Sequence, residues 1–520
     1  MDLCENISTI TTNSPVSETW EGYSDELGHY FMCEFASCSV PKFENEFYYD
    51  TEVVIIGNGP AAISLSAFLS GVELYYDGII PHPNQELHER LLNGKNETNL
   101  LYEDIDWFAQ EFESLIKAGT TPEASFYDTL NHISNNKENY LKVKINKDVY
   151  IPHMVIGSGE IGGSWNTYDD QMISLSVSSG MELPGYSIKE FLNSDRNDLR
   201  LPAILIREYF QKYVHKMNLA KNFVTNTKVI GIEKLCDISS KTQFWSVTCQ
   251  KDNLTYTVSC KKVVLAIGKN VVQKLDLKGT YDEDKILYEL RDLKSKIRAM
   301  QKRETCSTKN FLTSSNNALC LFCTKKINLN LVKVVVIGDG YGAADVVSYC
   351  LSMGIQTIHI IKRDKLQMKN HKLSSVSDSM YPEYSSIYRL MMGRIQNPNY
   401  IKYLGATVSE IYDDNVVIKT SKGDVCENYT FIVPCIGKKV DNTLQLENFH
   451  ISNTYRNRHD PTIFGIGSLI GDHYVRECVG GALAVARMIL KKTYTTTPES
   501  IVTIRDSVQK KIFLFDYANW

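Results

Sequence analysis

The chain lacks the features of a membrane or secreted protein. It has no apolar run of about 18 residues, which excludes a membrane-spanning helix. Its first residues, MDLCENISTITTNSP, have neither a basic start nor an apolar stretch, so no signal peptide is expected. The 13 cysteines are odd in number and scattered over 520 residues, which suits a reducing compartment better than a disulfide framework. We therefore expect a cytoplasmic protein.

An excess of basic charge and a pattern of metal ligands are also missing. The net charge of −5 and the pI of about 6.2 argue against a general nucleic-acid binder. Cys320 and Cys323 form one C-x-x-C without a second pair, so neither a zinc nor a redox role is expected. Four histidines lack the i, i+4 pairing with an acid that zinc sites show, so no metal site is expected. They are His82, His88, His132 and His153.

One glycine-rich stretch has the pattern of a dinucleotide-binding unit. The apolar run Val53–Ile56 predicts a buried parallel strand, and Ala61–Leu69 predicts a helix that packs on the sheet. A second strand is expected at Val72–Tyr76, which would complete a βαβ unit. The turn between the first strand and the helix reads G-x-G-x-x-A, at Gly57, Gly59 and Ala62.

This turn suits the pyrophosphate of a dinucleotide. The first glycine allows the tight turn, the second lets the phosphates approach the backbone, and the small sixth residue lets helix and strand meet. The helix N-terminus supplies free N–H groups and a partial positive charge. Asp77 lies about 20 positions after Gly57, where an acid often holds a ribose.

The same pattern recurs between Leu331 and Arg363. A β-branched strand runs into a second G-x-G-x-x-A, followed by a helix and another strand. That strand ends with Lys362 and Arg363, where an acid would favour NAD. Two cations there can hold a 2′-phosphate, which predicts NADPH; the alternative is a solvated surface pair. The glycines and alanine of this turn are Gly338, Gly340 and Ala343.

Each unit is followed by alternating strands that predict an antiparallel meander, ending at Gly268 and at Gly437. Two such units suggest a flavin site and a nicotinamide site. The expected fold class is α/β, with two Rossmann-like FAD/NAD(P)-binding domains, the NADP domain being inserted into the FAD domain. The expected division is a partly disordered leader at 1–50, the first part of the FAD-binding domain at 51–275 with an insertion at 78–149, the NADPH-binding domain at 276–430 with an insertion at 279–330, the second part of the FAD-binding domain at 431–490, and a tail at 491–520.

A third glycine motif, G-x-G-x-x-G at 157–162, is not expected to be a Rossmann turn. The residues after it, SWNTYDDQMISLS, have no helical apolar face, and a Rossmann turn must open a helix. Gly162, Gly163 and Trp165 instead predict a flexible loop that ends in a large flat ring. Such a ring can pack beside a planar heterocycle, although a buried core tryptophan is the alternative.

The last informative stretch is IFGIGSLIGDHYVRECVGGALAVARMIL, from Ile463 to Leu490. Asp472 follows Gly471 after an apolar strand, and a buried carboxylate there can accept hydroxyls from a ribityl chain. Gly480 and Gly481 are expected to open the helix ALAVARMIL, whose N-terminal dipole could stabilise negative charge on a reduced ring.

Taken together, several blocks resemble the oxidative stress-induced growth inhibitor family, which is itself similar to flavin-containing monooxygenases. The blocks are GNGPAA, GGSWNTYDDQMISLS with MELPG, GDGYGAADV, YPEY and GSLIGDHYVRECVGGALAVA, and the resemblance covers most of residues 50–490. It implies an FAD site at Gly57, Gly59, Pro60, Ala61, Ala62, Gly162, Gly163, Trp165, Gly471, Asp472, Gly480 and Gly481. It implies an NADPH site at Gly338, Gly340, Tyr341, Gly342, Ala343, Lys362 and Arg363.

The resemblance implies an FAD- and NADPH-dependent monooxygenase acting on a small molecule and O2, linked to restraint of cell growth. The F-x-G-x-x-x-H signature of flavin monooxygenases is absent between the two turns, where the chain reads LKGTYDEDKILYELRDL. A non-catalytic growth or redox regulator on the same scaffold is therefore the alternative, and a flavoprotein reductase ranks third. No catalytic acid, base or nucleophile is assigned, because a flavin would carry the chemistry.

Overall fold

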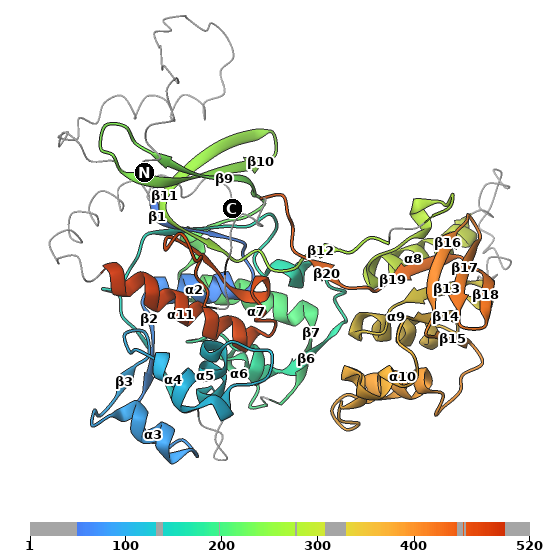
Figure 1. The fold of residues 1–520 in the computed structure, drawn as a ribbon, viewed down its shortest axis with the longest axis horizontal. Helices are drawn as coiled ribbons and strands as arrows, with labels where there is room; N and C mark the ends of the chain where they lie inside the picture. Colours follow the sequence, from blue (N-terminus) through green and yellow to red (C-terminus); the bar gives the residue numbers. More distant parts are fainter. Residues whose placement is uncertain are drawn as a thin grey trace, which may run out of the picture.

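The computed structural model describes residues 49–131, 139–196, 198–275, 278–306, 329–444, 451 and 454–493. These residues form two lobes (Figure 1). We call residues 49–275 with 454–493 the first half, and 278–444 the second half. The expected leader, the expected tail, His132 and the pair Cys320 and Cys323 lie wholly or mainly outside the described residues.

A largely parallel sheet forms the centre of the first half. Strand β1 (Thr51–Ile56) pairs in parallel with β5 (His153–Ile156) on one side and β11 (Leu254–Leu265) on the other. The short strands β8 (Phe223–Val224) and β21 (Ile463–Gly465) extend it in parallel, on β5 and β11 respectively. Because β1 is apolar and buried on both faces, it takes the central position that the sequence predicts for it.

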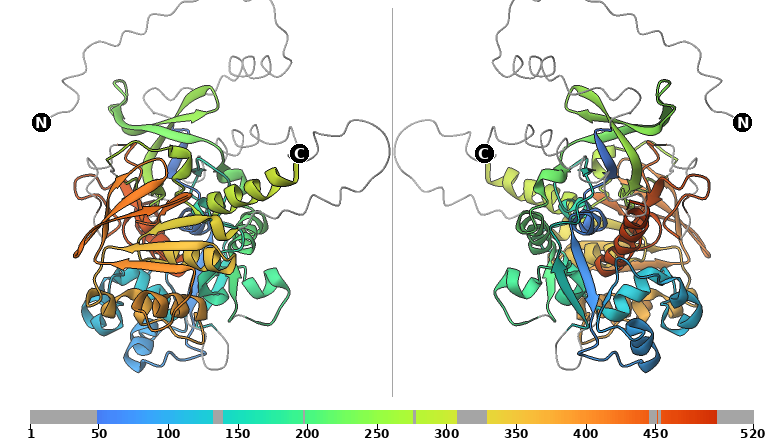
Figure 2. Two further views of the ribbon diagram at one scale, coloured as in Figure 1. Left: turned by 90° about the vertical axis from the view of Figure 1, so that its right-hand side faces the viewer. Right: turned by 90° about the vertical axis from the view of Figure 1, so that its left-hand side faces the viewer.

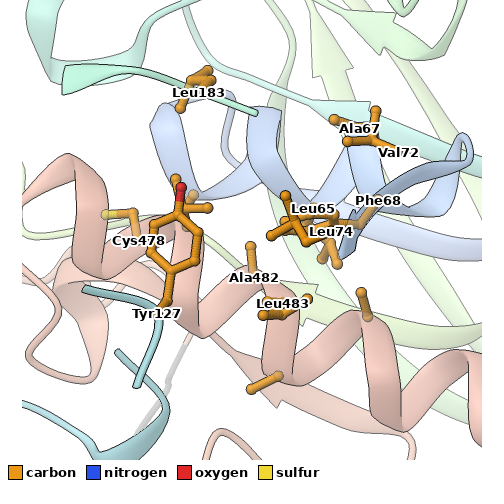
Figure 3. Packing of buried hydrophobic residues seen from close by; sticks show 14 of the residues in the cluster. Leu65, Ala67, Phe68, Val72, Leu74, Tyr127, Leu183, Cys478, Ala482 and Leu483 are labelled. Atoms are coloured by element: carbon orange, nitrogen blue, oxygen red, sulfur yellow. The ribbon is translucent and has the colours of Figure 1, made fainter. Parts of the chain in front are cut away.

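Helices cover one face of this sheet and a meander covers the other. Helix α2 (Pro60–Leu69) packs against α11 (Val475–Thr493), and Figure 3 shows Leu65 and Phe68 facing Ala482 and Leu483 between them. Helices α6 (Ile188–Leu192) and α7 (Ala203–Lys216) lie on the same side. The predicted meander is confirmed, since β9 (Lys228–Cys236), β10 (Gln243–Lys251) and β11 pair antiparallel.

The predicted βαβ pairing of β2 (Val72–Tyr76) with β1 is wrong. Strand β2 pairs instead with β3 (Thr98–Asn99) and β4 (Leu141–Ile145) in a separate antiparallel sheet. Within the predicted insertion the chain forms α3 (Gln85–Leu92), α4 (Asp106–Glu111) and α5 (Pro122–Leu130). This insertion and the β9–β10 hairpin lie at opposite ends of the first half (Figures 1 and 2).

A second parallel sheet forms the second half. Its order is β15 (Tyr400–Leu404), β14 (Gln356–Ile361), β13 (Lys333–Ile337) and β19 (Phe431–Pro434), all parallel. Helices α8 (Leu290–Cys306), α9 (Tyr341–Ser352) and α10 (Pro382–Met392) share one core cluster with this sheet. The meander β16 (Thr407–Ile411), β17 (Asn415–Thr420) and β18 (Gly423–Asn428) covers the other face. Strand β19 carries this half past residue 430, where its end was predicted.

Two short strands join the halves. Strand β12 (Val271–Val272) leaves the first half and pairs antiparallel with β20 (Lys438–Lys439), which returns to it (Figure 1). Strand β21 then pairs with β11, so the chain completes the first sheet after the second half. A smaller pair, β6 (Ile173–Val177) with β7 (Arg200–Pro202), lies where the halves meet. No helix within the described ranges is long and apolar enough to cross a membrane.

Candidate dinucleotide sites

The first glycine turn leaves the N-terminus of α2 open. Gly57 has φ +110°, and a Cβ there would lie 2.3 Å from the Ala266 carbonyl oxygen, so only glycine lets the turn pass this close to β11. Gly59 has ordinary φ, and its Cβ would meet only the Gly163 Cα, at 3.9 Å. No side chain caps the helix that starts at Pro60. The first-turn amides are therefore available to an anion.

Two other predicted segments reach the same helix start. A Cβ on Gly163 would lie 2.8 Å from the Gly59 Cα, and the Gly162 amide donates to the Asn58 carbonyl oxygen at 3.0 Å. A Cβ on Gly467, in the short helix η12 (Gly467–Leu469), would lie 3.0 Å from the Ala61 Cβ. Ala62 is fully buried behind the turn. The structure thus gathers three loops that are far apart in sequence.

The third glycine motif supports this arrangement and is not a Rossmann turn, as expected. It leads into η3 (Gly163–Asn166), a 3-10 helix of four residues. A Cβ on Gly157 would lie 2.1 Å from the Asn58 Nδ2, which donates to the Gly159 carbonyl oxygen at 2.7 Å. Gly157 is therefore needed so that the Asn58 side chain can tie the two loops together.

Asp77 does not lie beside the first glycine turn's sheet, because β2 has left that sheet. Its carboxylate forms an ion pair with Lys142 of β4 and accepts the Ile79 amide at 3.1 Å. The strand next to β1 is β5, so the polar residues at its end occupy the place expected for a ribose acid. The exposed Glu160 there accepts a hydrogen bond from the Asn226 side chain at 2.7 Å.

The Asp472 carboxylate is bonded within the protein. It is fully buried, accepts the Tyr455 hydroxyl at 3.0 Å, and lies 3.3 Å from the Thr121 hydroxyl, which also bonds to Tyr455. Burial raises the pKa of Asp472 to about 7. Gly471, by contrast, has φ +118° and open space around its Cβ position. In this arrangement there is open space beside Gly471, whereas the Asp472 oxygens are already engaged.

The predicted helix start at Gly480 and Gly481 is wrong. Helix α11 begins at Val475, and its Glu477 carboxylate accepts the amides of His473 and Tyr474 at 2.8 and 3.0 Å. Glu477 is the third residue of this helix, and an acid at that position that accepts amides preceding the helix is a capping signal. This signal in the stretch HYVREC marks the helix start. The two glycines lie inside α11, where a Cβ on Gly480 would be 2.7 Å from the Ala124 Cα. They make room for α5 and for Tyr455.

Trp165 is partly buried at the edge of the first core. Its ring meets Tyr168 and Phe210 edge-on, with centroids 5.3 and 6.3 Å away. It also lies on η3, two residues after Gly163, the glycine that approaches Gly59. Both earlier interpretations are compatible with this position, since the ring packs on the core and borders the gathered loops.

The second glycine turn also opens a helix without a side-chain cap. Gly338 has φ +122°, and a Cβ would lie 2.4 Å from the Cys435 carbonyl oxygen. Gly340 precedes α9, and the Cβ position of Gly342 is open. His359 of β14 supports the turn, since its Nε2–H donates to the Gly338 carbonyl oxygen at 2.6 Å while Nδ1 accepts the Tyr400 hydroxyl at 2.8 Å. Burial lowers the pKa of His359 to about 4, so the ring is neutral.

The predicted phosphate-binding cations differ in their contacts. Arg363 donates to the Asp339 carboxylate at 2.5 Å, and its side chain is half exposed. Lys362 is exposed to solvent. Lys372, which the sequence did not single out, lies over the Tyr341 ring at 4.9 Å, with Nζ 3.6 Å from the Cβ position of Gly340. Positive charge therefore surrounds this turn, together with one carboxylate.

The N-terminal end of α9 faces the junction of the halves. The Tyr341 ring meets Tyr384 of α10 edge-on at 5.0 Å, and the Tyr381 hydroxyl donates to the Leu175 carbonyl oxygen of β6 at 2.8 Å. Burial raises the pKa of Tyr341, and Tyr474 of the first half raises it further. Tyr474 lies three residues after Gly471, so the Gly471 loop and the second glycine turn both border this junction.

Titratable groups also gather there. Burial raises the pKa of Asp345, on α9, to about 7, and Tyr384 hydrogen-bonds to it. The partly buried Arg200 guanidinium contacts the Glu383 carboxylate at 2.7 Å. Sequence reasoning missed this cluster because its members come from three separate segments. Among the described residues, no group of three or more histidine, cysteine or acidic side chains gathers as metal ligands would.

The backbone of each glycine turn fits the pyrophosphate of a dinucleotide. Each combines a glycine at positive φ, a second glycine with space beside it, and an uncapped helix N-terminus, which is the chemistry that holds a pyrophosphate.

Comparison with known proteins agrees with this architecture. An oxidative stress induced growth inhibitor homolog from Caenorhabditis elegans is 34% identical over 450 residues, which make up 85% of this chain and 94% of the relative. Human oxidative stress-induced growth inhibitor 1 is 26% identical over 496 residues, covering 86% and 96%. No family model matches the chain.

Among solved structures, the bacillithiol disulfide reductase Bdr (YpdA) from Bacillus cereus is similar, with a TM-score of 0.51 at 13% identity, covering 85% of this chain and 99% of that one. The Staphylococcus aureus enzyme gives a TM-score of 0.50 at 11% identity, with coverages of 85% and 98%. At such identities the likeness shows the fold, a mixed α/β architecture with parallel-sheet cores. Because the worm relative is 34% identical over 85% of this chain, the chain belongs to the oxidative stress-induced growth inhibitor family.

Proposed function

We propose that the protein is an FAD- and NADPH-dependent oxidoreductase of the monooxygenase type, acting on a small molecule and O2. The observation that carries the proposal is the pair of uncapped helix N-termini, at Gly59 and Gly340, each behind a glycine turn. FAD would lie on the first turn with Gly57, Pro60, Ala61 and Ala62 around it, and NADPH on the second with Tyr341, Gly342 and Ala343.

In this proposal the chain's own residues bind and orient the two cofactors and take no direct part in the reaction. The gathered loops at Gly163 and Gly467 close around the first turn, and Trp165 would flank the ring system. Bound FAD would supply the electron transfer between the nicotinamide and a second acceptor. His359 bonds to the Gly338 carbonyl oxygen and the Cys435 amide donates to the Ile337 carbonyl oxygen, so the nicotinamide nucleotide would enter a preformed site.

One observation favours the second candidate, a non-catalytic growth or redox regulator. Asp77 is paired with Lys142, and Asp472 with Tyr455, so neither acid predicted to hold FAD is free. On this scaffold the nucleotide sites would stabilise the fold or sense the redox state. Growth restraint, as in the family's name, would act through protein partners.

Two glycine variants test the proposal. Gly59→Ala and Gly340→Ala both suit the local backbone, and neither new Cβ comes closer than 3.6 Å to another group outside the turn. Each would place a methyl group where phosphates must approach. We expect Gly59→Ala to lose bound flavin, and Gly340→Ala to keep it but lose affinity for NADPH.

The measurements are the flavin absorbance of the purified protein and its bleaching by NADPH without oxygen. A yellow wild-type protein that NADPH bleaches faster than NADH supports the oxidoreductase. A colourless protein that cannot be reconstituted with FAD would leave only the regulator.

A further inference from the structure

The second glycine turn carries an acid at a position where the nucleotide is chosen. Asp339 lies between Gly338 and Gly340, and its side chain is only 14% exposed. Its carboxylate accepts a hydrogen bond from Arg363 at 2.5 Å and lies 3.5 Å from the His371 Nε2. The His371 Nδ1 accepts the Leu373 amide, so Nε2 carries the proton and donates to Asp339.

The charge on Asp339 is maintained by these contacts. Burial alone would raise the pKa of its carboxyl group, but the bonds from His371 and Arg363 outweigh burial and hold the pKa well below its usual range. Asp339 is therefore an anion at neutral pH, fixed against the guanidinium of Arg363.

This pair lies where the adenosine ribose of a nicotinamide nucleotide is recognised. In a βαβ unit, the residues after the second strand face the ribose, an acid favouring the 2′-hydroxyl and an arginine the 2′-phosphate. Strand β14 ends at Ile361, and the positions after it carry Lys362 and Arg363. Asp339 brings an acid to the same place from the glycine turn. Asp364 does not, because its carboxylate accepts the amides of Leu366 and Gln367.

We propose, building on the function proposed above, that Asp339 sets the choice between NADPH and NADH by competing with the 2′-phosphate for Arg363. A 2′-phosphate must displace the carboxylate from the guanidinium or accept its repulsion at close range. A 2′-hydroxyl can instead donate to Asp339 while Arg363 stays in place. Lys362 and Lys372 supply attraction to the phosphate, so the wild-type protein keeps a preference for NADPH, which the competition from Asp339 makes small.

Binding of NADP⁺ and NAD⁺ to the full-length protein, measured by titration calorimetry, tests this assignment without turnover. We expect the two dissociation constants of the wild-type protein to agree within about tenfold, and Asp339→Asn to shift their ratio about tenfold towards NADP⁺, because one like charge is removed. The double variant Asp339→Asn/Arg363→Ala should lose that shift. Asp364→Asn, whose carboxylate only caps its own turn, is the matched control and should leave the ratio unchanged.

Arg363→Gln gives a second route if Asp339→Asn proves unstable. It leaves Asp339 bonded to His371 alone, without a guanidinium to neutralise it, and should move the ratio about tenfold towards NAD⁺. If both nucleotides bind and neither variant changes the ratio, Asp339 is not the discriminating residue, although the proposed function survives. If neither nucleotide binds the wild-type protein, the proposed function fails, and the role of Asp339 fails with it.

Discussion

Asp472 is the residue whose place in the structure most changes what its sequence position suggests. Its carboxylate lies in a fully buried group with Tyr455 and Thr121, where burial raises its pKa to about 7. An unfolded aspartate titrates near 3.9. The folded protein therefore holds a proton that the unfolded chain releases, and this contribution to stability is lost as the pH rises towards 7.

Replacing Asp472 by asparagine tests this. Asparagine keeps an oxygen for Tyr455 and cannot ionise. We expect the stability of Asp472→Asn relative to wild type to rise by about 2–4 kcal/mol between pH 5 and pH 8, measured by urea unfolding at several pH values. Asp284→Asn is the control, because the Asp284 side chain is 87% exposed. A relative stability of Asp472→Asn that does not change with pH would contradict the expectation.

At this scale the sequence predicts the glycines of turns well and the partners of charged side chains poorly. Gly57, Gly163 and Gly338 have the positive φ or the close backbone approach that their motifs require. By contrast, the charged groups that were assigned to ligands are bonded within the protein. Asp77 pairs with Lys142, Asp472 with Tyr455, and Arg363 with Asp339. Spacing in the sequence specifies the backbone of a turn, whereas the partner of a charged side chain depends on segments far away along the chain.

The elements that contact α11 show why its glycines are present. Helix α5, from the insertion, lies so close that a Cβ on Gly480 would be 2.7 Å from the Ala124 Cα and 3.0 Å from the Glu123 carbonyl oxygen. Gly481 similarly leaves room for the Tyr455 ring. These glycines therefore serve helix packing within the first core.

Gly480→Ala should lower the free energy of unfolding by about 1–3 kcal/mol, because backbone must move. That cost outweighs the roughly 1 kcal/mol by which alanine favours a helix. Gly342→Ala, in α9, is the matched variant: its Cβ position is open, and it should raise stability by about 0.5–1 kcal/mol. Denaturant unfolding of both variants checks the pair. Equal effects of the two substitutions would be inconsistent with this explanation.

Helices and the first meander could be predicted because each has its own apolar period. The partner of β2 could not, since VELYY suits either sheet equally. What decides is the segment LKVKI, which supplies an antiparallel partner after the insertion, so that β5 takes the place beside β1. Strand pairing is a long-range choice, which no local pattern specifies.

Over the whole molecule, Arg200 is a principal contact between the halves. From β7 its guanidinium donates to the Ser174 carbonyl oxygen at 2.7 Å, and across the junction to the Met380 carbonyl oxygen at 2.9 Å and the Glu383 carboxylate at 2.7 Å. It also lies 4.5 Å from the centre of the Tyr381 ring. The Arg200 side chain is 12% exposed and the Glu383 side chain 36% exposed, so this contact is only partly shielded from water.

Arg200→Ala should therefore weaken the coupling of the two halves by about 1–2 kcal/mol, because the charged hydrogen bonds that it removes across the junction are partly screened by solvent. We expect calorimetry to show broader or separate unfolding transitions, with earlier proteolysis between the halves. Arg207→Ala removes an ion pair of comparable length, 3.0 Å to Asp170, that stays within the first half. If the two variants unfold alike, Arg200 does not join the halves.

The return of the chain through β20 and β21 has a consequence for biosynthesis. A ribosome releases all of the second half before it releases β21 and α11, which complete the sheet and the helical layer of the first. Residues 49–275 of the first half therefore stay incompletely folded, with the apolar surface of α2 uncovered, while the second half folds. We expect nascent chains that stop before Ile463 to depend on chaperones, and to be released from them once the final helix has emerged.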